Sequence, residues 1–314
     1  MRIVQAPRAC AILYHILASQ KEGKPWLLPA NICPIVPITF LKARLPFEFV
    51  DVSAETLHMD LGQAEDRIKQ HKLGGLLYAH TYGEPSTPTD FFNEIKSLNP
   101  ELLIVDDRCL CIPEFDAQSS ADVTLYSTGY AKIVDLQFGG YALLENDLTY
   151  QTRSLTFNAA DHAEIERAYK KAVKERTRFI YNDMDWLETD TYLPEWEDYR
   201  LQIESGLKES LARRARLNEI YASRLPLELQ LPQEYQMWRF NIRVKNKSKV
   251  MRAIFEAGLF ASSHYASLTG IMAEGSAPHA DTLADEVINL FNDHHFDVDM
   301  AAQICDLILE NYEG

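Results

Sequence analysis

Three polar residues in the first half of the chain have types and spacing that could do chemistry on one shared ligand. Asp107 ends the apolar run LLIVDD, Ser127 ends DVTLYS, and Lys132 stands in STGYAK. A carboxylate keeps the ring nitrogen of pyridoxal phosphate protonated, and a lysine amine bonds to its aldehyde and later moves a proton. A hydroxyl and backbone N–H groups hold its phosphate. The combination predicts a pyridoxal phosphate site.

Each of these residues also has an ordinary structural explanation when it is taken alone. An Asp at a strand end commonly caps a turn, and a loop Lys is commonly solvated. A Ser at a strand end commonly bonds to nearby backbone. Only the joint spacing of the three favours the functional interpretation.

Apolar runs that alternate with helix-like segments predict the elements that must position these residues. Strands are expected at 26–29, 47–52, 74–80, 102–107, 122–127 and 139–145, with helices at 7–19, 64–70 and 88–98. Continuous apolar strands separated by helices indicate an α/β fold with a mostly parallel sheet covered on both faces. Ligands of such sheets bind at the carboxyl ends of the strands, where His80, Tyr82, Asp107 and Ser127 would lie.

The second half of the chain has a different pattern. It predicts a charged helix at 160–182, a long helix at 200–225, a strand at 237–244, and helices at 248–257, 282–290 and 298–312. Ser248 is the expected N-cap of its helix. We therefore expect a large cofactor-binding α/β domain over 1–195. Residues 196–314 would hold a long connecting helix and a small α+β domain.

Segments along nearly the whole chain resemble the DegT/DnrJ/StrS family of pyridoxal-phosphate aminotransferases, which act mainly on nucleotide-linked keto-sugars. The closest match is LLYAHTYGEPSTP, which is similar to a strand and turn of the form V-H-x-Y-G-x-P. The other similar segments follow the family's order: RACAILYHILAS, LLPANICPIVPITF with FEFVDVSAETLHMD, LLIVDDRCLC, YSTGYAK, FGGYALLEN, WEDYRLQIESGLKESLARRARLNEIYASRL and AGLFASSHYASL.

The resemblance implies the fold-type-I architecture of pyridoxal-phosphate enzymes and assigns roles to matching positions. Lys132 would be the Schiff-base lysine, and Asp107 would pair with the pyridine nitrogen. Ser127 would bind the phosphate, together with backbone around Arg8 and Ala9 at the start of the first helix. The implied reaction moves an amino group from an amino acid to a keto-sugar nucleotide.

Four further residues match positions near the implied site. His80 and Tyr82 lie at a strand end, where packing and turn formation are equally good explanations. His264 and Tyr265 would lie near the substrate entrance, although a structural turn is the more ordinary interpretation.

The chain also departs from the family pattern. Cys33 stands near the position of an aromatic residue that stacks on the cofactor ring, and Leu110 replaces a Gln that bonds to the cofactor's phenol oxygen. Asp198 replaces an Asn that reaches the phosphate of the neighbouring subunit, where a carboxylate would repel a phosphate dianion. The family's N-terminal arm is expected to be absent.

These departures leave two alternatives to sugar amination. The same scaffold could perform other carbanion chemistry with pyridoxal phosphate. It could also be a member that has lost catalysis and acts as a binding or regulatory subunit. The resemblance implies a homodimer with shared active sites. The aromatic residues Trp186, Trp196 and Tyr199 are either part of that interface or a cover for the long helix.

Composition excludes several other classes of protein. The chain has 314 residues and a net charge of −15, which disfavours binding to nucleic-acid polymers and to anionic membranes. Its five cysteines make a poor disulfide framework and favour the cytoplasm, and Cys109 and Cys111 lack the second pair that a zinc site needs. We therefore expect no metal. The run ACAILYHILAS resembles a short signal-peptide core, but an amphipathic helix is the better interpretation.

Overall fold

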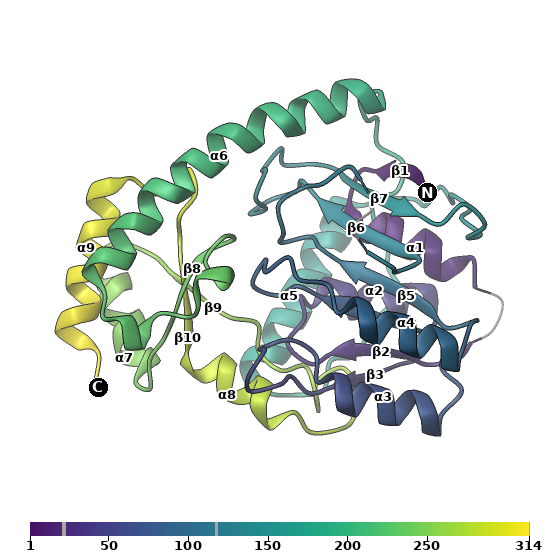
Figure 1. Ribbon diagram of the computed structural model, residues 1–314, viewed down its shortest axis with the longest axis horizontal. Helices are drawn as coiled ribbons and strands as arrows, with labels where there is room; N and C mark the ends of the chain where they lie inside the picture. The colour runs from purple at the N-terminus through teal and green to yellow at the C-terminus, as the bar shows by residue number, and fades with distance from the viewer. Residues whose placement is uncertain (21–22, 117–118, 314) are drawn as a thin grey trace.

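The computed structural model describes residues 1–20, 23–116 and 119–313, and Figure 1 shows their arrangement. The first part of the chain forms, in order, β1 (Arg2–Ala6), α1 (Ala9–Ala18), β2 (Trp26–Pro29), α2 (Ile35–Ala43), β3 (Phe47–Val50), α3 (Leu61–Gln70), β4 (Gly75–Ala79), α4 (Thr89–Leu98), β5 (Leu103–Asp107), β6 (Val123–Ser127) and β7 (Gly140–Leu144).

The second part begins with helices and contains a separate small sheet. Its elements are α5 (Ala159–Glu175), α6 (Trp196–Arg224), two short 3₁₀ helices (Leu227–Leu229 and Gln233–Tyr235), β8 (Phe240–Arg243), α7 (Lys247–Glu256), β9 (Ser262–Ser263), α8 (Pro278–Glu286), β10 (Val287–Leu290) and α9 (Val298–Asn311).

Seven strands form the large sheet, in the order β1-β7-β6-β5-β4-β2-β3. The five strands from β6 to β3 are parallel, whereas β7 and β1 are antiparallel to their neighbours. The predicted α/β fold with a mostly parallel sheet is therefore confirmed. Strand β1 was not predicted, because it is a partly exposed edge strand whose partner β7 lies far away in sequence.

Burial on both faces explains the continuous apolar runs of the central strands. Along β4 and β5, Leu77 and Val105 pack into one hydrophobic core, and Leu76 and Ile104 pack into another on the opposite face. Successive side chains of a strand point to opposite faces. The same alternation separates the two carboxylates that end β5.

The small sheet is antiparallel, in the order β8-β10-β9, and it packs with α6, α7 and α9 around its own core. Helix α6 runs along the top of Figure 1 from the large sheet to the small one. The predicted small α+β unit is therefore present. We propose that the domain boundary lies near residue 195, as the sequence suggested, with α8 returning to the large unit. Asp51, which follows β3 in the large unit, makes this contact with the start of α8. Its carboxylate accepts hydrogen bonds from the backbone N–H groups of His279 (3.1 Å) and Ala280 (3.0 Å).

Two local predictions in the second half were wrong. The helix expected at 282–290 ends at Glu286, because the next residues form the buried strand β10 between β8 and β9. Ser248 is not an N-cap, because α7 already begins at Lys247 and its preceding residue makes no side-chain capping bond. Helix α2 was also missed, since Pro34 and Pro37 obscure its pattern, although proline fits a first helical turn.

The N-terminal apolar run forms α1, and most of its side chains are buried in the large core. In the part of the chain that the structure describes, no helix has both the length and the apolar character needed to cross a membrane. Trp186 and Tyr199 are buried within the chain, so they cover internal surfaces instead of forming an exposed interface.

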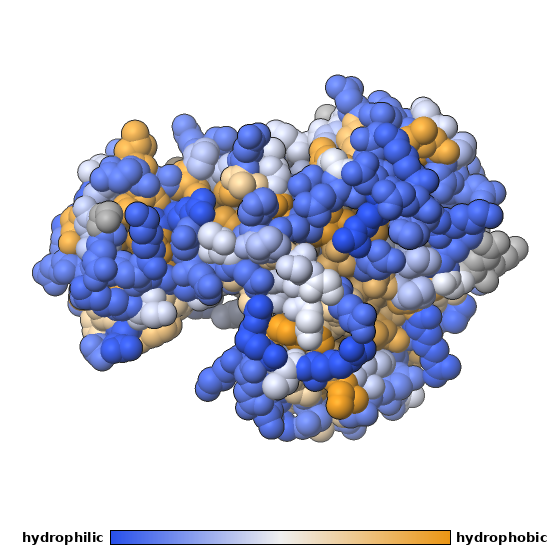
Figure 2. Space-filling view, turned by 90° about the horizontal axis from the view of Figure 1, so that it is seen from below, coloured by the Kyte–Doolittle hydropathy of each residue, from blue (hydrophilic) through white to orange (hydrophobic). Residues whose placement is uncertain are grey.

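The surface seen in Figure 2 is mainly hydrophilic, and hydrophobic side chains occur there in scattered groups. A recess separates the part at the left from the rest of the molecule. Scattered exposed apolar residues are usual for a soluble fold.

Gly140→Ala is expected to destabilise the protein by about 1–3 kcal/mol, because an added Cβ would lie 2.6 Å from the backbone nitrogen of Ala9. Gly62→Ala is the control, since its Cβ would meet nothing closer than 3.4 Å and alanine favours the helix. Urea unfolding of both variants measures the effect. Equal unfolding midpoints for Gly140→Ala and the wild type would contradict this packing.

Candidate functional site

A cavity lies at the carboxyl ends of β4 and β5, beside the loop that follows β6. Its walls combine apolar and polar side chains from distant parts of the sequence: Ile32, Cys33, Ala79, His80, Thr81, Asp107, Cys109, Leu110, Lys132 and Tyr265. The structure thus brings six of the predicted site residues to one cavity: Cys33, His80, Asp107, Leu110, Lys132 and Tyr265.

The two carboxylates at the end of β5 have different surroundings. Asp106 accepts hydrogen bonds from His80 (2.7 Å) and Thr87 (3.1 Å) and forms an ion pair with Arg108 (3.4 Å). Burial alone would raise the pKa of Asp106, but the bond from His80 and the charge of Arg108 hold that pKa below its usual value.

Asp107 faces the cavity instead. It is buried, and its Oδ1 accepts a hydrogen bond from the backbone of Cys109 (3.0 Å). No described residue forms an ion pair with it. This carboxylate is therefore available to a cationic group in the cavity.

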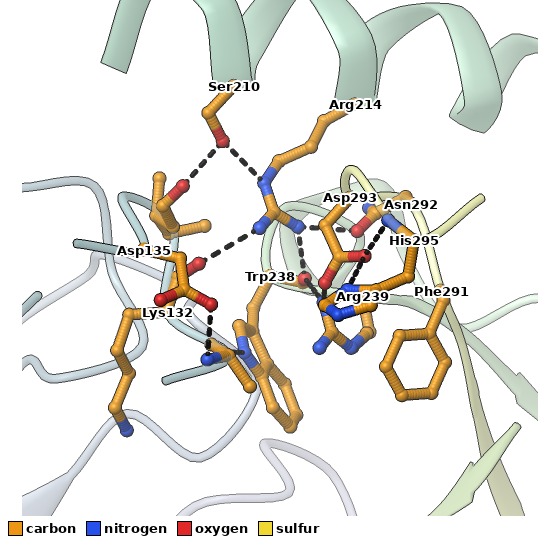
Figure 3. Close-up of polar contacts among 12 residues, drawn as sticks. Lys132, Asp135, Ser210, Arg214, Trp238, Arg239, Phe291, Asn292, Asp293 and His295 are labelled. Atoms are coloured by element: carbon orange, nitrogen blue, oxygen red, sulfur yellow. Dashed lines mark hydrogen bonds and ion pairs between the residues drawn. The ribbon is translucent and has the colours of Figure 1, made fainter. Parts of the chain in front are cut away.

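Lys132 reaches the same cavity from a tight loop. The preceding Ala131 has a left-handed φ of 60°, and its N–H donates to Oδ2 of Asp135 (2.9 Å). Figure 3 shows the Lys132 side chain extending away from the polar cluster around Arg214. Among residues 1–20, 23–116 and 119–313, none accepts a hydrogen bond from its amino group. The amino group is therefore available to a ligand in the cavity.

Ser127 and Arg8 approach each other beside Gly129. A Cβ added to Gly129 would lie 3.6 Å from the hydroxyl of Ser127 and 3.9 Å from a guanidinium nitrogen of Arg8. Arg8 also pairs with Glu188 (3.1 Å) and is the extended N-cap of α1, which has no side-chain capping bond. The N–H of Ala11 donates to the carbonyl of Arg8 (3.0 Å), so the N–H groups before it in the first turn are the ones that can bind an anion. The arrangement fits a phosphate cradle.

Tyr199 ties α6 to this region, a contact that sequence reasoning missed. Its hydroxyl bonds to that of Thr128 (2.5 Å), which donates to the carbonyl of Phe138 (2.7 Å). Burial raises the pKa of Tyr199 to about 12, so it remains a neutral donor. Gly139, with a φ of 90°, is required beside it, because a Cβ there would overlap the Tyr199 hydroxyl.

His80 is fixed at both ring nitrogens. Nε2 faces Asp106, and Nδ1 lies 2.5 Å from the carbonyl oxygen of Glu84. Contacts at both ring nitrogens therefore fix the orientation of this imidazole in the cavity wall.

Tyr82 and His264 do not line the cavity. Their rings stack on each other with centroids 4.1 Å apart, and both side chains are buried. Burial lowers the pKa of His264 to about 3, aided by the charges of Lys247 and His58. These two residues form a packing contact behind the site.

Tyr265 lies against Cys33 in the cavity wall. Burial raises the pKa of the Tyr265 phenol, and its charge interaction and hydrogen bond with the Cys33 thiol act in the same direction. Asp198, by contrast, is exposed in the first turn of α6 and lies outside the cavity of its own chain. A single chain therefore does not bring Asp198 to the site.

One cluster in the described part of the chain has the composition of a metal site: Asp293, His294 and His295. Asp293 already accepts hydrogen bonds from Arg239 (2.7 Å) and from His295 (3.0 Å). Its carboxylate therefore has protein partners, and the positive charge of Arg239 beside it opposes a cation.

No family model and no curated protein matches the sequence. Several solved structures are similar in fold. A DegT/DnrJ/EryC1/StrS aminotransferase from Brucella abortus has 17% identity and a TM-score of 0.67, with 99% of this chain and 86% of that chain covered. The putative sugar aminotransferase Spr1654 from Streptococcus pneumoniae, in its PMP form, has 16% identity and a TM-score of 0.71, with 98% and 85% covered.

DesI, determined in the presence of its TDP-sugar product, has 15% identity and a TM-score of 0.74, with 98% of this chain and 80% of that chain covered. The likeness extends over nearly the whole chain and concerns the fold. The fold predicted from the family resemblance, that of the pyridoxal-phosphate aminotransferases, is therefore confirmed.

His264 is expected to make stability fall as the pH falls below about 6.5. The folded protein holds this imidazole neutral down to a pKa of about 3, whereas the unfolded chain takes up its proton near 6.5. One such group contributes a slope of up to about 1.4 kcal/mol per pH unit. His264→Phe keeps a ring against Tyr82 and removes this contribution.

Urea unfolding between pH 7 and pH 4 compares the two proteins. The variant should lose less stability than the wild type over this interval. His15 and His58, whose pKa values burial also lowers, are present in both proteins. Equal acid slopes would show that His264 is not held neutral.

Proposed function

We propose that this protein is a pyridoxal-phosphate-dependent aminotransferase that moves an amino group from an amino acid to a nucleotide-linked keto-sugar. One observation carries the proposal. Asp107 and Lys132 line the same cavity, and neither has a charged partner among the described residues. Leaving a buried carboxylate unpaired is costly unless a ligand supplies the missing partner.

Residues in and beside the cavity could bind the ring nitrogen, the aldehyde and the phosphate of this cofactor. Asp107 would pair with the pyridine nitrogen, and Lys132 would bond to the aldehyde carbon. Ser127 and the backbone around Arg8 and Ala9, at the start of α1, would hold the phosphate. When bound, the cofactor supplies an electron sink for the carbanion formed at the amino acid's α-carbon.

The chain's own residues then divide the remaining work. Lys132 would act as the general base that takes the α-proton of the donor amino acid, and then as the general acid that gives the proton back. Asp107 keeps its partner nitrogen protonated by charge.

The keto-sugar substrate rests on similarity of fold. DesI was determined in the presence of its TDP-sugar product, and Spr1654 is described as a putative sugar aminotransferase. For a chain with a net charge of −15, an anionic sugar nucleotide requires local cations. We propose that the substrates are small molecules of this class.

We also propose that the protein is a cytoplasmic homodimer with shared active sites. Large apolar side chains are exposed near the site end of α6, including Tyr192 (87%), Leu201 (61%) and Tyr130 (62%). Asp198 is exposed between the first two and would face the partner subunit. The five cysteines are all free thiols, which suits a reducing compartment.

One observation favours a second candidate function. Cys33 and Leu110 line the cavity at positions where the family has an aromatic residue and a Gln. Cys33 cannot stack on the cofactor ring as an aromatic residue does, and Leu110 cannot bond to its phenol oxygen. A catalytically inactive binding or regulatory subunit, or other carbanion chemistry with the same cofactor, is the alternative.

A panel of amino donors and keto-sugar nucleotides separates these functions. An aminotransferase converts the donor to its keto acid and the sugar to its amine in equal amounts. Consumption of substrate without amine formation identifies other carbanion chemistry. Cofactor affinity no better than that of an unrelated protein identifies a binding subunit.

Lys132→Ala is expected to lower the rate of keto-acid formation by at least about 10²–10⁴-fold, because the proton-transfer group is lost. The cofactor's absorption band from its covalent link to lysine should disappear as well. Lys245→Ala, at an exposed position, is the matched control and should retain both. Unchanged keto-acid formation by Lys132→Ala would contradict the assignment.

Leu201→Glu is expected to weaken the dimer, because it places a charge on the proposed interface. Size-exclusion chromatography with light scattering should give twice the chain mass for the wild type and a smaller mass for the variant at low concentration. Leu227→Glu is the control, since Leu227 is 81% exposed at the small unit. A monomeric wild type would contradict the shared site.

A further inference from the structure

Three successive backbone carbonyls at and beside Lys132 each accept a hydrogen bond from a side chain that lies far from this loop in sequence. The indole N–H of Trp238 donates to the carbonyl of Ala131 (2.8 Å), and a guanidinium N–H of Arg214 donates to that of Lys132 (3.2 Å). The hydroxyl of Ser210 donates to the carbonyl of Ile133. Figure 3 shows Ser210 and Arg214 above the loop and Trp238 beside it, with the Lys132 side chain pointing away from Arg214.

Arg214 is at the centre of this arrangement. It lies in the middle of α6 and is 1% exposed. Besides the Lys132 carbonyl, its N–H groups reach the Ser210 hydroxyl (3.1 Å), the carbonyl of Trp238 (2.5 Å) and the side-chain oxygen of Asn292 (2.5 Å). Trp238 precedes β8 and Asn292 follows β10. One guanidinium therefore joins the small sheet to the lysine loop.

All of these acceptors are neutral. In the described ranges no carboxylate forms an ion pair with Arg214, and burial lowers its pKa to about 10, with the nearby Arg239 acting in the same direction. Asp293, whose charge acts on Arg214 in the opposite direction, pairs with Arg239 instead (2.7 Å). Burying a cation without an anionic partner is unfavourable for stability. The planar guanidinium of Arg214 has five N–H donors in fixed directions, which suits it to hold several acceptors in one geometry.

We propose that Arg214 is a positioning residue that sets the orientation of Lys132 according to the placement of the small unit. The inference rests on the proposed function, because it concerns the reactivity of the Lys132 amine. Movement of Trp238 and Asn292 with the small sheet would move the guanidinium. The guanidinium would in turn move the backbone from which the Lys132 side chain extends.

The consequence is separate control of cofactor binding and cofactor attachment. Asp107, Ser127 and the start of α1 belong to other elements and do not contact Arg214. Loss of Arg214 should therefore leave the cofactor's noncovalent affinity nearly unchanged, within about 3-fold. It should reduce proton transfer and attachment by Lys132 by about 10²-fold, the usual effect of misplacing a reacting group by about 1 Å.

The test compares Arg214→Met with Arg213→Met. Arg213 is the adjacent, partly exposed arginine, paired with Glu209 (3.3 Å), and its variant should behave as the wild type. Three quantities are measured: the dissociation constant for pyridoxamine phosphate, which has no aldehyde and cannot bond to lysine, the fraction of bound pyridoxal phosphate fixed to Lys132 by borohydride, and kcat. A fall in the last two for Arg214→Met, with the dissociation constant unchanged, supports the proposal. A rise in the dissociation constant together with lower attachment, lower kcat and a lower melting temperature, or no change in attachment, overturns it.

Trp238→Phe and Arg214→Lys keep the proposal testable if Arg214→Met does not fold. Trp238→Phe removes only the donor to the Ala131 carbonyl and keeps an aromatic ring. Arg214→Lys keeps the positive charge and loses the planar set of N–H donors. Each should lower attachment by Lys132 several-fold while leaving noncovalent affinity within about 3-fold. Normal attachment in both folded variants overturns the proposal.

A measurement without cofactor separates this inference from the proposed function. Pulse acetylation of the cofactor-free protein, followed by peptide mass mapping, gives the reactivity of Lys132 relative to exposed Lys245. The ratio should change in Arg214→Met and not in Arg213→Met. An unchanged ratio overturns the positioning role. Failure of the wild type to bind the cofactor would instead count against the proposed function alone.

Discussion

The structure keeps a carboxylate and an amine in one cavity, and no residue of its described part forms an ion pair with either of them. The remaining contacts of the site follow from that constraint. Asp107 and Lys132 come from adjoining strand ends of one parallel sheet. Other charged groups nearby have protein partners: Asp106 is held by His80 and Arg108, and Arg8 by Glu188. Neutralising these neighbours leaves the two cavity groups for a ligand.

The backbone of β5 and of the loop after β6 sets where these two side chains point. The alternation of side chains along β5 sends Asp106 to one face of the strand and Asp107 to the other. The loop after β6 must then present an amine without burying unsatisfied carbonyls. Trp238, Arg214 and Ser210 satisfy those carbonyls from α6 and from the start of the small sheet. The chemistry of the large unit thus depends on groups that follow it in sequence.

The sequence predicted the central strands well, because LLIVDD and GGLLYAH are continuous apolar runs typical of strands buried on both faces. It did not predict β10, since VINL fits a helix as well as a strand until its neighbours β8 and β9 are known. Strand β1 depends in the same way on a distant partner.

Site residues could be predicted only where a single short segment of sequence identified them. Lys132, Asp107 and Ser127 stand at strand ends in recognisable segments. Arg214 lies within the charged run ARRAR, and nothing in that run distinguishes it from the partly exposed Arg213. Its role depends on the carbonyls of Lys132 and Trp238. These carbonyls come close to Arg214 only because α6 extends from the large sheet to the small one and packs against both units.

The central claim is that this cavity holds pyridoxal phosphate through Asp107 and Lys132. Incubation of the wild type with the cofactor, reduction with borohydride and peptide mass mapping test it most directly. The account predicts one phosphopyridoxyl adduct, located on Lys132, that saturates at one per chain and is greatly reduced in Asp107→Ala. No adduct at saturating cofactor, or one spread over surface lysines with Lys132 unmodified, would contradict the account.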